Sequence, residues 1–234
     1  METSTRLTQD VKKLVKLVER MQGESGQNVY KCFTTFIDVS LEALRRAKVR
    51  DLAWKPELGV FEPAYDTLCR MVAVLFDQLL PEITYQDVVG ALYMDLETSS
   101  KHFGQFFTPF PVAQMMAMLT IPTDEVTLSR YTRERPLTIC DPACGSGIML
   151  LAAASILPPG FIEHGRAAFY GMDIDDLCVK MAQLNATLYG LDGVPAFIKT
   201  TTELTPDEVE RLPEPHKSQI QQTLFDLKET KEAA

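Results

Sequence analysis

The 234-residue sequence has no long apolar run. Hydrophobic residues make up 46% of the chain, yet none of its apolar stretches reaches the roughly 18 to 20 residues that a membrane-spanning helix needs. Met1–Asp10 is polar and lacks the apolar stretch of a secretory signal. We therefore expect a soluble, cytoplasmic protein, long enough for a full core and organised as one domain with an appended segment.

Cysteine is scarce and scattered. The five cysteines are odd in number and lie mostly in apolar segments, a pattern that indicates reduced core thiols rather than a disulfide framework. Cys140 and Cys144 raise the alternative of a zinc site. Because no second Cys/His pair stands at a metal-binding spacing, we predict no metal.

Positive charge is also in deficit. The formal net charge of -9 opposes nonspecific attraction to nucleic acid, which depends on Lys and Arg neutralising phosphates. One dense basic cluster occurs, formed by Arg45, Arg46, Lys48 and Arg50. Such a cluster is usually a solvated helix end, and a contact with DNA is the less favoured alternative.

The first hundred residues have the periodicity of helices. Apolar residues recur at intervals of three and four in three segments: Val11, Leu14, Val15 and Val18; Tyr30, Phe33, Ile37, Leu41 and Leu44; and Tyr65, Leu68, Val72, Leu75 and Leu79. Thr84 and Asp87 resemble a capping box that would open a fourth helix. Its buried face would contain Val88, Leu92 and Leu96.

The pattern changes after Gly104 to short apolar runs that alternate with helical segments. We predict helices over Ser146–Leu157 and Asp176–Tyr189, ended by Pro158-Pro159-Gly160 and by Gly190. Strands are predicted over Leu137–Cys140, Ala168–Met172 and Ala196–Ile198. Alternating strands and helices imply βαβ units and a parallel sheet. The chain therefore divides into a helical segment (1–103), an α/β domain (104–204) and an acidic helical tail (205–234).

The most informative segment is Thr138–Gly147, in which a strand ends in Asp141 and passes through two glycines into a helix. Glycines let the backbone approach a ligand closely, and ligands of parallel sheets bind beyond the carboxyl ends of the strands. Asp173 ends the second strand, where an acid typically accepts hydrogen bonds from ribose hydroxyls. Together the two segments predict a site for a nucleoside-bearing cofactor.

Two common phosphate-binding patterns are missing, namely GxxxxGK[ST] and GxGxxG. ATP and dinucleotides are therefore disfavoured. A cationic sulfonium compound with an amino-acid end fits better, with Asp141 holding the amino group and Asp173 the ribose.

At these residues the chain resembles the N6-adenine DNA methyltransferase family. DPACGSG at 141–147 resembles motif I of that family, and GQFFTP at 104–109 resembles the segment that precedes it in modification subunits of type I restriction systems. GMDID at 171–175 completes the expected order. The resemblance implies S-adenosyl-L-methionine as the cofactor and a Rossmann-like methyltransferase fold with strands ordered 3-2-1.

The resemblance also implies a role for each matching position. Four residues would line the methionine part of the cofactor: Asp141, Ala143, Gly145 and Gly147. Asp173 would bind the ribose, and Ile174 would pack on the adenine. Phe107, Thr108 and Pro109 would close the pocket from the other side. Core packing is an equal alternative for Phe106 and Phe107. A helix N-cap is a weaker alternative for Asp173, because Asp175 is better placed for that cap.

The family's catalytic motif, [ND]-P-P-[FY], is not found downstream of Ile198. That loop holds the flipped adenine. Leu157–Phe161 resembles it superficially but lacks the polar first residue, so we interpret it as a helix stop.

Three hypotheses remain. The chain is a DNA adenine methyltransferase that needs a partner for catalysis, a cofactor-binding subunit or sensor without turnover, or a degenerate interaction protein. Because the first strand would lie at the edge of the sheet, we expect pairing with a second copy, another methyltransferase chain or a specificity subunit.

Overall fold

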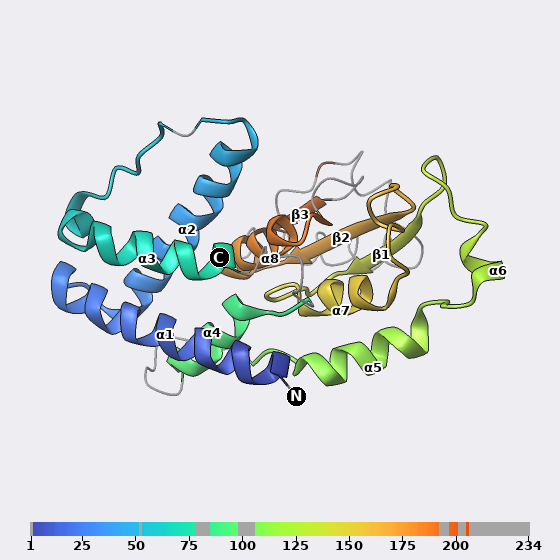
Figure 1. Ribbon diagram of the computed structural model, residues 1–234, viewed down its shortest axis with the longest axis horizontal. Helices are drawn as coiled ribbons and strands as arrows, with labels where there is room; N and C mark the ends of the chain where they lie inside the picture. Colours follow the sequence, from blue (N-terminus) through green and yellow to red (C-terminus); the bar gives the residue numbers. More distant parts are fainter. Residues whose placement is uncertain are drawn as a thin grey trace, which may run out of the picture.

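A computed structural model describes residues 2–51, 53–77, 85–97, 106–191 and 197–200, together with Thr205. Its elements, in chain order, are α1 (Glu2–Ser25), α2 (Val29–Lys48), a 3-10 helix η1 (Gly59–Ala64), α3 (Tyr65–Phe76), α4 (Val88–Glu97), α5 (Phe110–Thr120), α6 (Glu125–Leu128), β1 (Leu137–Asp141), α7 (Ile148–Ile156), β2 (Ala167–Asp173), α8 (Asp176–Leu188) and β3 (Phe197–Thr200). Helices α1 to α3 lie at one end of the molecule, and the sheet with α5 and α7 lies at the other (Figure 1). This organisation confirms the predicted α/β class.

The sheet is parallel, and its strands are ordered β1-β2-β3, as expected. Ile139 lies opposite Phe169, and Tyr170 lies opposite Phe197. Helix α7 packs on β1, whereas α8 packs on β2 and β3. Since all three strands run in one direction, their carboxyl ends meet at one edge of the sheet, where ligands of such folds bind.

The apolar stripes of the helical segment form a core with one face of α8. Leu14, Phe33 and Leu68 are buried in one cluster with Leu177 and Met181. Helix α8 thereby joins the helical segment to the sheet. The prediction for the third stripe was partly wrong. Met71 is fully buried where burial of Val72 was expected, and Val72 is a partly buried residue that packs against the cluster. Leu79 lies outside the described residues.

The start of the fourth helix differs from the prediction. Helix α4 begins at Val88, and Asp87 is its N-terminal cap, because the Asp87 carboxylate accepts a hydrogen bond from the Gly90 amide at 2.7 Å. The capping box had placed Asp87 inside the helix. Its proposed first residue, Thr84, lies outside the described residues. The predicted inner face is confirmed by the burial of Val88, Leu92 and Leu96.

The other helix ends follow the sequence signals. Helix α7 ends before Pro158, and Gly160 adopts a φ of 77° in the turn that follows. Helix α8 ends before Gly190, whose φ is 68°. Leu157–Phe161 is thus a helix stop, as interpreted. The predicted tail is outside the described residues except for Thr205.

Helix α5 packs on α7 through small residues, with Ala113, Ala117 and Ala152 buried between them. Its opposite side is apolar and exposed, most of all at Met118 and Leu119, which are 58% and 78% exposed. Within the described ranges, none of the helices has both the length and the apolar character required to cross a membrane.

Candidate functional site

The candidate site is built on the turn between β1 and α7. Gly145 and Gly147 have φ angles of 52° and 86°, in the left-handed region that favours glycine. The turn is fastened to the neighbouring strand, because the Cys144 amide donates to the Met172 carbonyl at 2.8 Å. The backbone of the turn therefore requires glycine at both positions, whereas the predicted close approach to a ligand stays a prediction.

The carboxylate of Asp173 connects this turn to the start of α8. One oxygen accepts a hydrogen bond from the Gly145 amide at 2.9 Å, and the other accepts from the Asp175 amide at 3.0 Å. A carboxylate has about four acceptor positions in all, which suits Asp173 to accept several hydrogen bonds at once. Asp175 itself caps α8 by accepting from the Leu177 amide at 2.9 Å, as predicted.

Asp141 stands at the other side of the turn, at the end of β1. Its carboxylate accepts a hydrogen bond from the Ala143 amide at 3.1 Å. Asp141 and Asp173 thus end neighbouring parallel strands, one on either side of the glycine turn.

Phe107 covers the turn from the side of the helical segment. A Cβ atom added at Gly145 would lie 2.9 Å from the Phe107 ring, so ring and backbone are in close contact. The ring stacks obliquely on Tyr93 of α4, with centroids 5.0 Å apart. The Phe107 amide also donates to the Met94 sulfur at 3.4 Å. Core packing and closure of the site, the two alternatives for Phe107, are both compatible with this position. Core packing was wrong for Phe106, which is 83% exposed.

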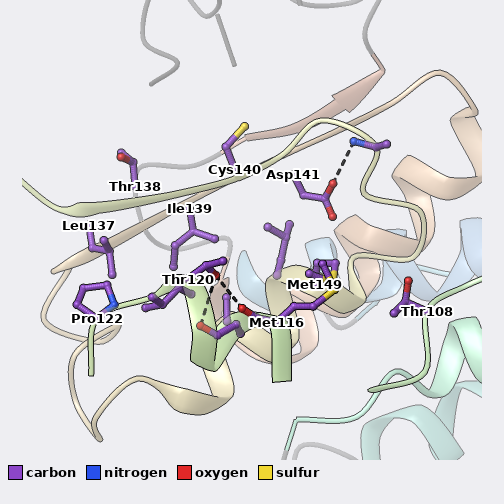
Figure 2. A pocket seen from close by; sticks show the side chains of 15 residues that line it. Thr108, Met116, Thr120, Pro122, Leu137, Thr138, Ile139, Cys140, Asp141 and Met149 are labelled. Atoms are coloured by element: carbon purple, nitrogen blue, oxygen red, sulfur yellow. Dashed lines mark hydrogen bonds between the residues drawn. The ribbon is translucent and has the colours of Figure 1, made fainter. Parts of the chain in front are cut away.

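A cavity of about 550 Å³ lies between α5, α7 and β1 (Figure 2). Thr108, Asp141 and Ala143 line it, and Figure 2 shows Thr108 and Asp141 at one end, with Leu137 and Pro122 at the other. Its volume is within the roughly 300 to 1,000 Å³ typical of small-molecule sites. The cavity does not include Asp173, which lies beyond the turn on the side of β2.

The remaining predicted residues take different positions around the turn. Ile174 is 74% exposed, next to Asp173. Pro109 is exposed and caps α5. Gly147 faces α8, where an added Cβ would lie 3.2 Å from the Ala182 Cβ. The structure therefore brings Phe107, Gly145 and Asp173 into contact, places Thr108, Asp141 and Ala143 around the cavity, and leaves Pro109 and Ile174 on the surface.

The cysteines near the site are protonated thiols. Burial, with the nearby charge of Asp141, raises the pKa of Cys140 to about 12. Burial also raises the pKa of Cys144 well above its ordinary value. Among the described residues, no group of three or more His, Cys, Asp or Glu side chains could hold a metal ion. None of the five cysteines, all of which lie in the described part of the chain, forms a disulfide, but Cys69 is exposed, so the interpretation of the set as core thiols was wrong for that residue.

The basic cluster lies at the end of α2, far along the chain from the turn. Arg46 forms ion pairs with Glu42 at 2.6 Å and with Asp51 at 3.2 Å, and Arg45 donates to Gln183 of α8 at 3.0 Å. These contacts are those of a solvated helix end, the favoured interpretation.

A buried polar cluster beneath the turn was missed by the sequence analysis. Asp87 and Asn185 are 4% and 1% exposed, and Ser146 is fully buried. Ser146 donates its hydroxyl proton to the Asp87 carboxylate. Asn185 donates to Asp87 at 2.7 Å and to the Ser146 carbonyl at 2.8 Å. Two signals could have pointed to this cluster: the amide side chain of Asn185 in the apolar helix α8, and Gly90 inside α4.

The fold and the site define a class of protein: a parallel α/β protein with acidic residues and a glycine turn at the carboxyl ends of its first two strands. The family model for N-6 DNA methylases matches residues 86–223. The chain belongs to this family.

Individual relatives agree with that assignment. The chain is 26% identical over 118 residues to the type I restriction enzyme MpnII methylase subunit of Mycoplasma pneumoniae. That match covers 50% of this chain and 20% of the methylase subunit. A shorter match, 37% identical over 59 residues, is to the ribosomal protein L11 methyltransferase of Caldanaerobacter subterraneus, and covers 25% of this chain and 16% of that enzyme.

Among solved structures, the chain is similar to the methyltransferase subunit of a type I restriction-modification system from Streptococcus thermophilus. The two are 21% identical with a TM-score of 0.40, and the superposition covers 86% of this chain and 41% of the other. The chain therefore spans less than half the length of each of these relatives.

Proposed function

We propose that this chain is the S-adenosyl-L-methionine-binding part of a DNA N6-adenine methyltransferase with a Rossmann-like fold, and that methylation requires a partner polypeptide. The observation that carries the proposal is the position of Gly145, which contacts the Phe107 ring on one side and the Asp173 carboxylate on the other. All three positions belong to motifs that the sequence shares with the family.

The residues present suit this cofactor. Asp141 and Asp173 offer anionic acceptors for an ammonium group and for ribose hydroxyls, which form charge-assisted hydrogen bonds. Ile174 presents an exposed apolar side chain beside Asp173, and a flat adenine ring would remove that surface from water. When bound, S-adenosyl-L-methionine supplies an activated methyl group on a sulfonium centre. The chain's own residues bind the cofactor and orient it at the strand ends.

Two observations support a contribution from a second polypeptide. The 234 residues contain no [ND]-P-P-[FY] stretch, the motif that holds the flipped adenine in this family. Helix α5 also presents apolar side chains on its exposed side, including Met115, Met118 and Leu119. Exposed apolar surface of this kind marks a contact with another polypeptide. A second copy of the chain, another methyltransferase chain or a specificity subunit fits this requirement, with DNA as the substrate of the assembly.

A cofactor sensor without turnover is the alternative, favoured by the same missing motif. It shares the binding step, so the first experiment is calorimetric titration of the purified chain with S-adenosyl-L-methionine. Asp173→Ala removes both acceptor oxygens and should weaken binding by about 1.5–3 kcal/mol, the range for hydrogen bonds to charged groups.

Asp175→Ala is the matched control, because it removes a carboxylate two residues away that accepts a hydrogen bond from the backbone of helix α8. It should lower stability without changing affinity. Equal affinities for wild type and a folded Asp173→Ala protein would refute the ribose assignment, and absence of binding by the wild type would refute the cofactor.

A further inference from the structure

Helix α4 contacts both halves of the candidate site. At its N-terminus, Asp87 accepts the hydroxyl proton of Ser146, which lies between the two glycines of the turn. One to two turns further along the helix, Tyr93 stacks on the Phe107 ring and Met94 accepts the Phe107 amide proton. The glycine turn and the aromatic residue that covers it are therefore held by one element.

The Asp87 carboxylate is held by three donors. It receives hydrogen bonds from the Gly90 amide, the Ser146 hydroxyl and the Asn185 side chain. These donors belong to α4, the turn and α8. A buried carboxylate that loses such partners carries a large desolvation cost, so the three elements are fixed relative to one another.

Two further contacts set the position of α4 itself. The Tyr189 hydroxyl accepts the Gln86 amide proton and donates to the Gln86 carbonyl, both at 2.9 Å. Val88, Leu92 and Tyr93 lie in the same buried cluster as Leu184 and Leu188 of α8. Helix α4 is thus docked on α8, which contacts both the sheet and the helical segment.

Gly90 is required by this arrangement. A Cβ atom at Gly90 would overlap the Asp87 carboxylate and would lie 2.7 Å from the Ser146 hydroxyl oxygen. The glycine lowers helix propensity by about 1 kcal/mol relative to alanine. Its presence inside α4 is explained by the space that the buried cluster needs.

We propose that helix α4 holds the glycine turn and Phe107 in position relative to each other, and that Asp87 is the positioning residue of the candidate site. Through Ser146, Asp87 fixes the glycine turn, and through Tyr93 and Met94 the same helix fixes Phe107 over Gly145. The proposal rests on the proposed function and deepens it, since it assigns the geometry of the cofactor site to hydrogen bonds that Asp87 makes with the turn and with α8.

The test uses hydrogen exchange of the full chain, which needs no ligand. In Asp87→Ala, amides of residues 106–110 and 144–150 should both exchange faster, because both halves of the site lose their support. Ser146→Ala should affect the turn alone. Thr67→Val is the matched control: Thr67 is a buried hydroxyl that also donates to a carboxylate, that of Glu24 at 2.7 Å, but between α1 and α3. It should leave both segments unchanged.

The affinity for S-adenosyl-L-methionine gives a second readout. Asp87→Ala and Ser146→Ala should weaken it roughly tenfold or more, equivalent to about 1.4 kcal/mol, whereas Thr67→Val should not. Asp87→Asn should restore most of the affinity, because its oxygen can accept from Gly90 and Asn185 while its amide donates to the Ser146 hydroxyl.

Gly90→Ala should act like Asp87→Ala. Gly23→Ala in α1, where an added Cβ meets nothing within 4 Å, should be neutral.

The outcomes separate the two proposals. Absence of cofactor binding in the wild type, together with the expected exchange pattern, would refute the proposed function and leave the role of α4 intact. Unchanged exchange in Asp87→Ala, or equal effects in Thr67→Val, would overturn the role of α4 whatever the cofactor does. Should Asp87→Ala not fold, Ser146→Ala and Gly90→Ala decide the matter in the same way.

Discussion

The two glycines of the turn between β1 and α7 hold backbone angles that other residues rarely adopt. The sequence motifs predicted that these two glycines allow the backbone to approach a ligand closely. The structure adds that their neighbours are protein atoms, namely the Phe107 ring at Gly145 and Ala182 at Gly147. A side chain at either position would therefore disturb the turn even before a ligand arrives.

Gly147→Val should abolish cofactor binding. Valine is strained at a φ of 86° and its Cβ would press on Ala182 of α8, so the turn must move. The matched control is Gly26→Val, at a φ of 69° in the linker between α1 and α2, where an added Cβ meets nothing within 4 Å. Both variants should lose stability, and calorimetric titration should show lost binding in Gly147→Val alone. Normal binding by a folded Gly147→Val protein would place the pocket elsewhere.

The buried Asp87 should make stability depend on pH in a definite direction. Burial raises the pKa of its carboxyl above the ordinary 3.8, against the opposing effect of hydrogen bonds from Ser146, Gly90 and Asn185. The unfolded chain therefore releases this proton at a lower pH than the folded protein. The contribution of Asp87 to stability is largest below about pH 3.8 and declines as pH rises toward the folded-state pKa.

Urea unfolding of wild type and Asp87→Asn between about pH 4 and 8 measures this effect. The free energy of unfolding of wild type, relative to Asp87→Asn, should fall with rising pH. Carboxyls with lowered pKa values, such as Asp124 and Glu134, act in the opposite direction in both proteins and cancel in the difference. A difference that is constant across the range, or that grows with pH, would contradict the raised pKa.

At the scale of elements, the contact between α5 and α7 depends on small side chains. Ala113 and Ala117 of α5 meet Ala152 of α7 with almost no exposed surface. Ala152→Leu should lower the free energy of unfolding by about 1–3 kcal/mol, because the larger side chain forces the helices apart. Met149→Leu is the control on the same helix. This substitution also introduces a leucine but conserves side-chain volume. It should lower the free energy of unfolding, measured in urea, by less than about 1.5 kcal/mol.

Elements whose signal is local could be predicted from the sequence. The stripes at Leu14, Phe33 and Leu92 and the apolar run of β2 follow from periodicity alone, since one face of each helix and both faces of a central parallel strand must be buried. The apolar run of β1 also predicted a strand, but only Leu137 of that strand is buried. The ends at Pro158 and Gly190 follow from backbone restrictions of the residues themselves.

Features that depend on distant partners could not be predicted in this way. Asp87 meets Ser146 and Asn185, which lie 59 and 98 positions further along the chain. Gly90 is the one local signal near Asp87, and it does not identify Ser146 or Asn185 as the partners. The choice of Met71 over Val72 for burial is likewise made by neighbouring helices, because both residues fit the helical period.

Charged side chains are distributed unevenly over the whole molecule. Its net charge is -9, and its basic residues at the end of α2 are engaged with Glu42, Asp51 and Gln183. The carboxylates of the candidate site, by contrast, lie at the strand ends. A cofactor with a positive centre is attracted to that region, whereas a phosphate backbone gains little from it.

We therefore expect the isolated protein to bind S-adenosyl-L-methionine without methylating DNA. Transfer to an adenine amino group requires the base to leave the stack and to be held by polar and aromatic groups, and the 234 residues contain no [ND]-P-P-[FY] stretch to do so. Cofactor affinity by itself does not accelerate transfer, because only interactions that strengthen in the transition state raise the rate. Purified protein incubated with unmethylated DNA and radiolabelled cofactor should yield no labelled adenine, with a complete adenine methyltransferase as the positive control. Formation of N6-methyladenine that disappears in Asp141→Ala would contradict this expectation and would require an adenine pocket built from other residues of this chain.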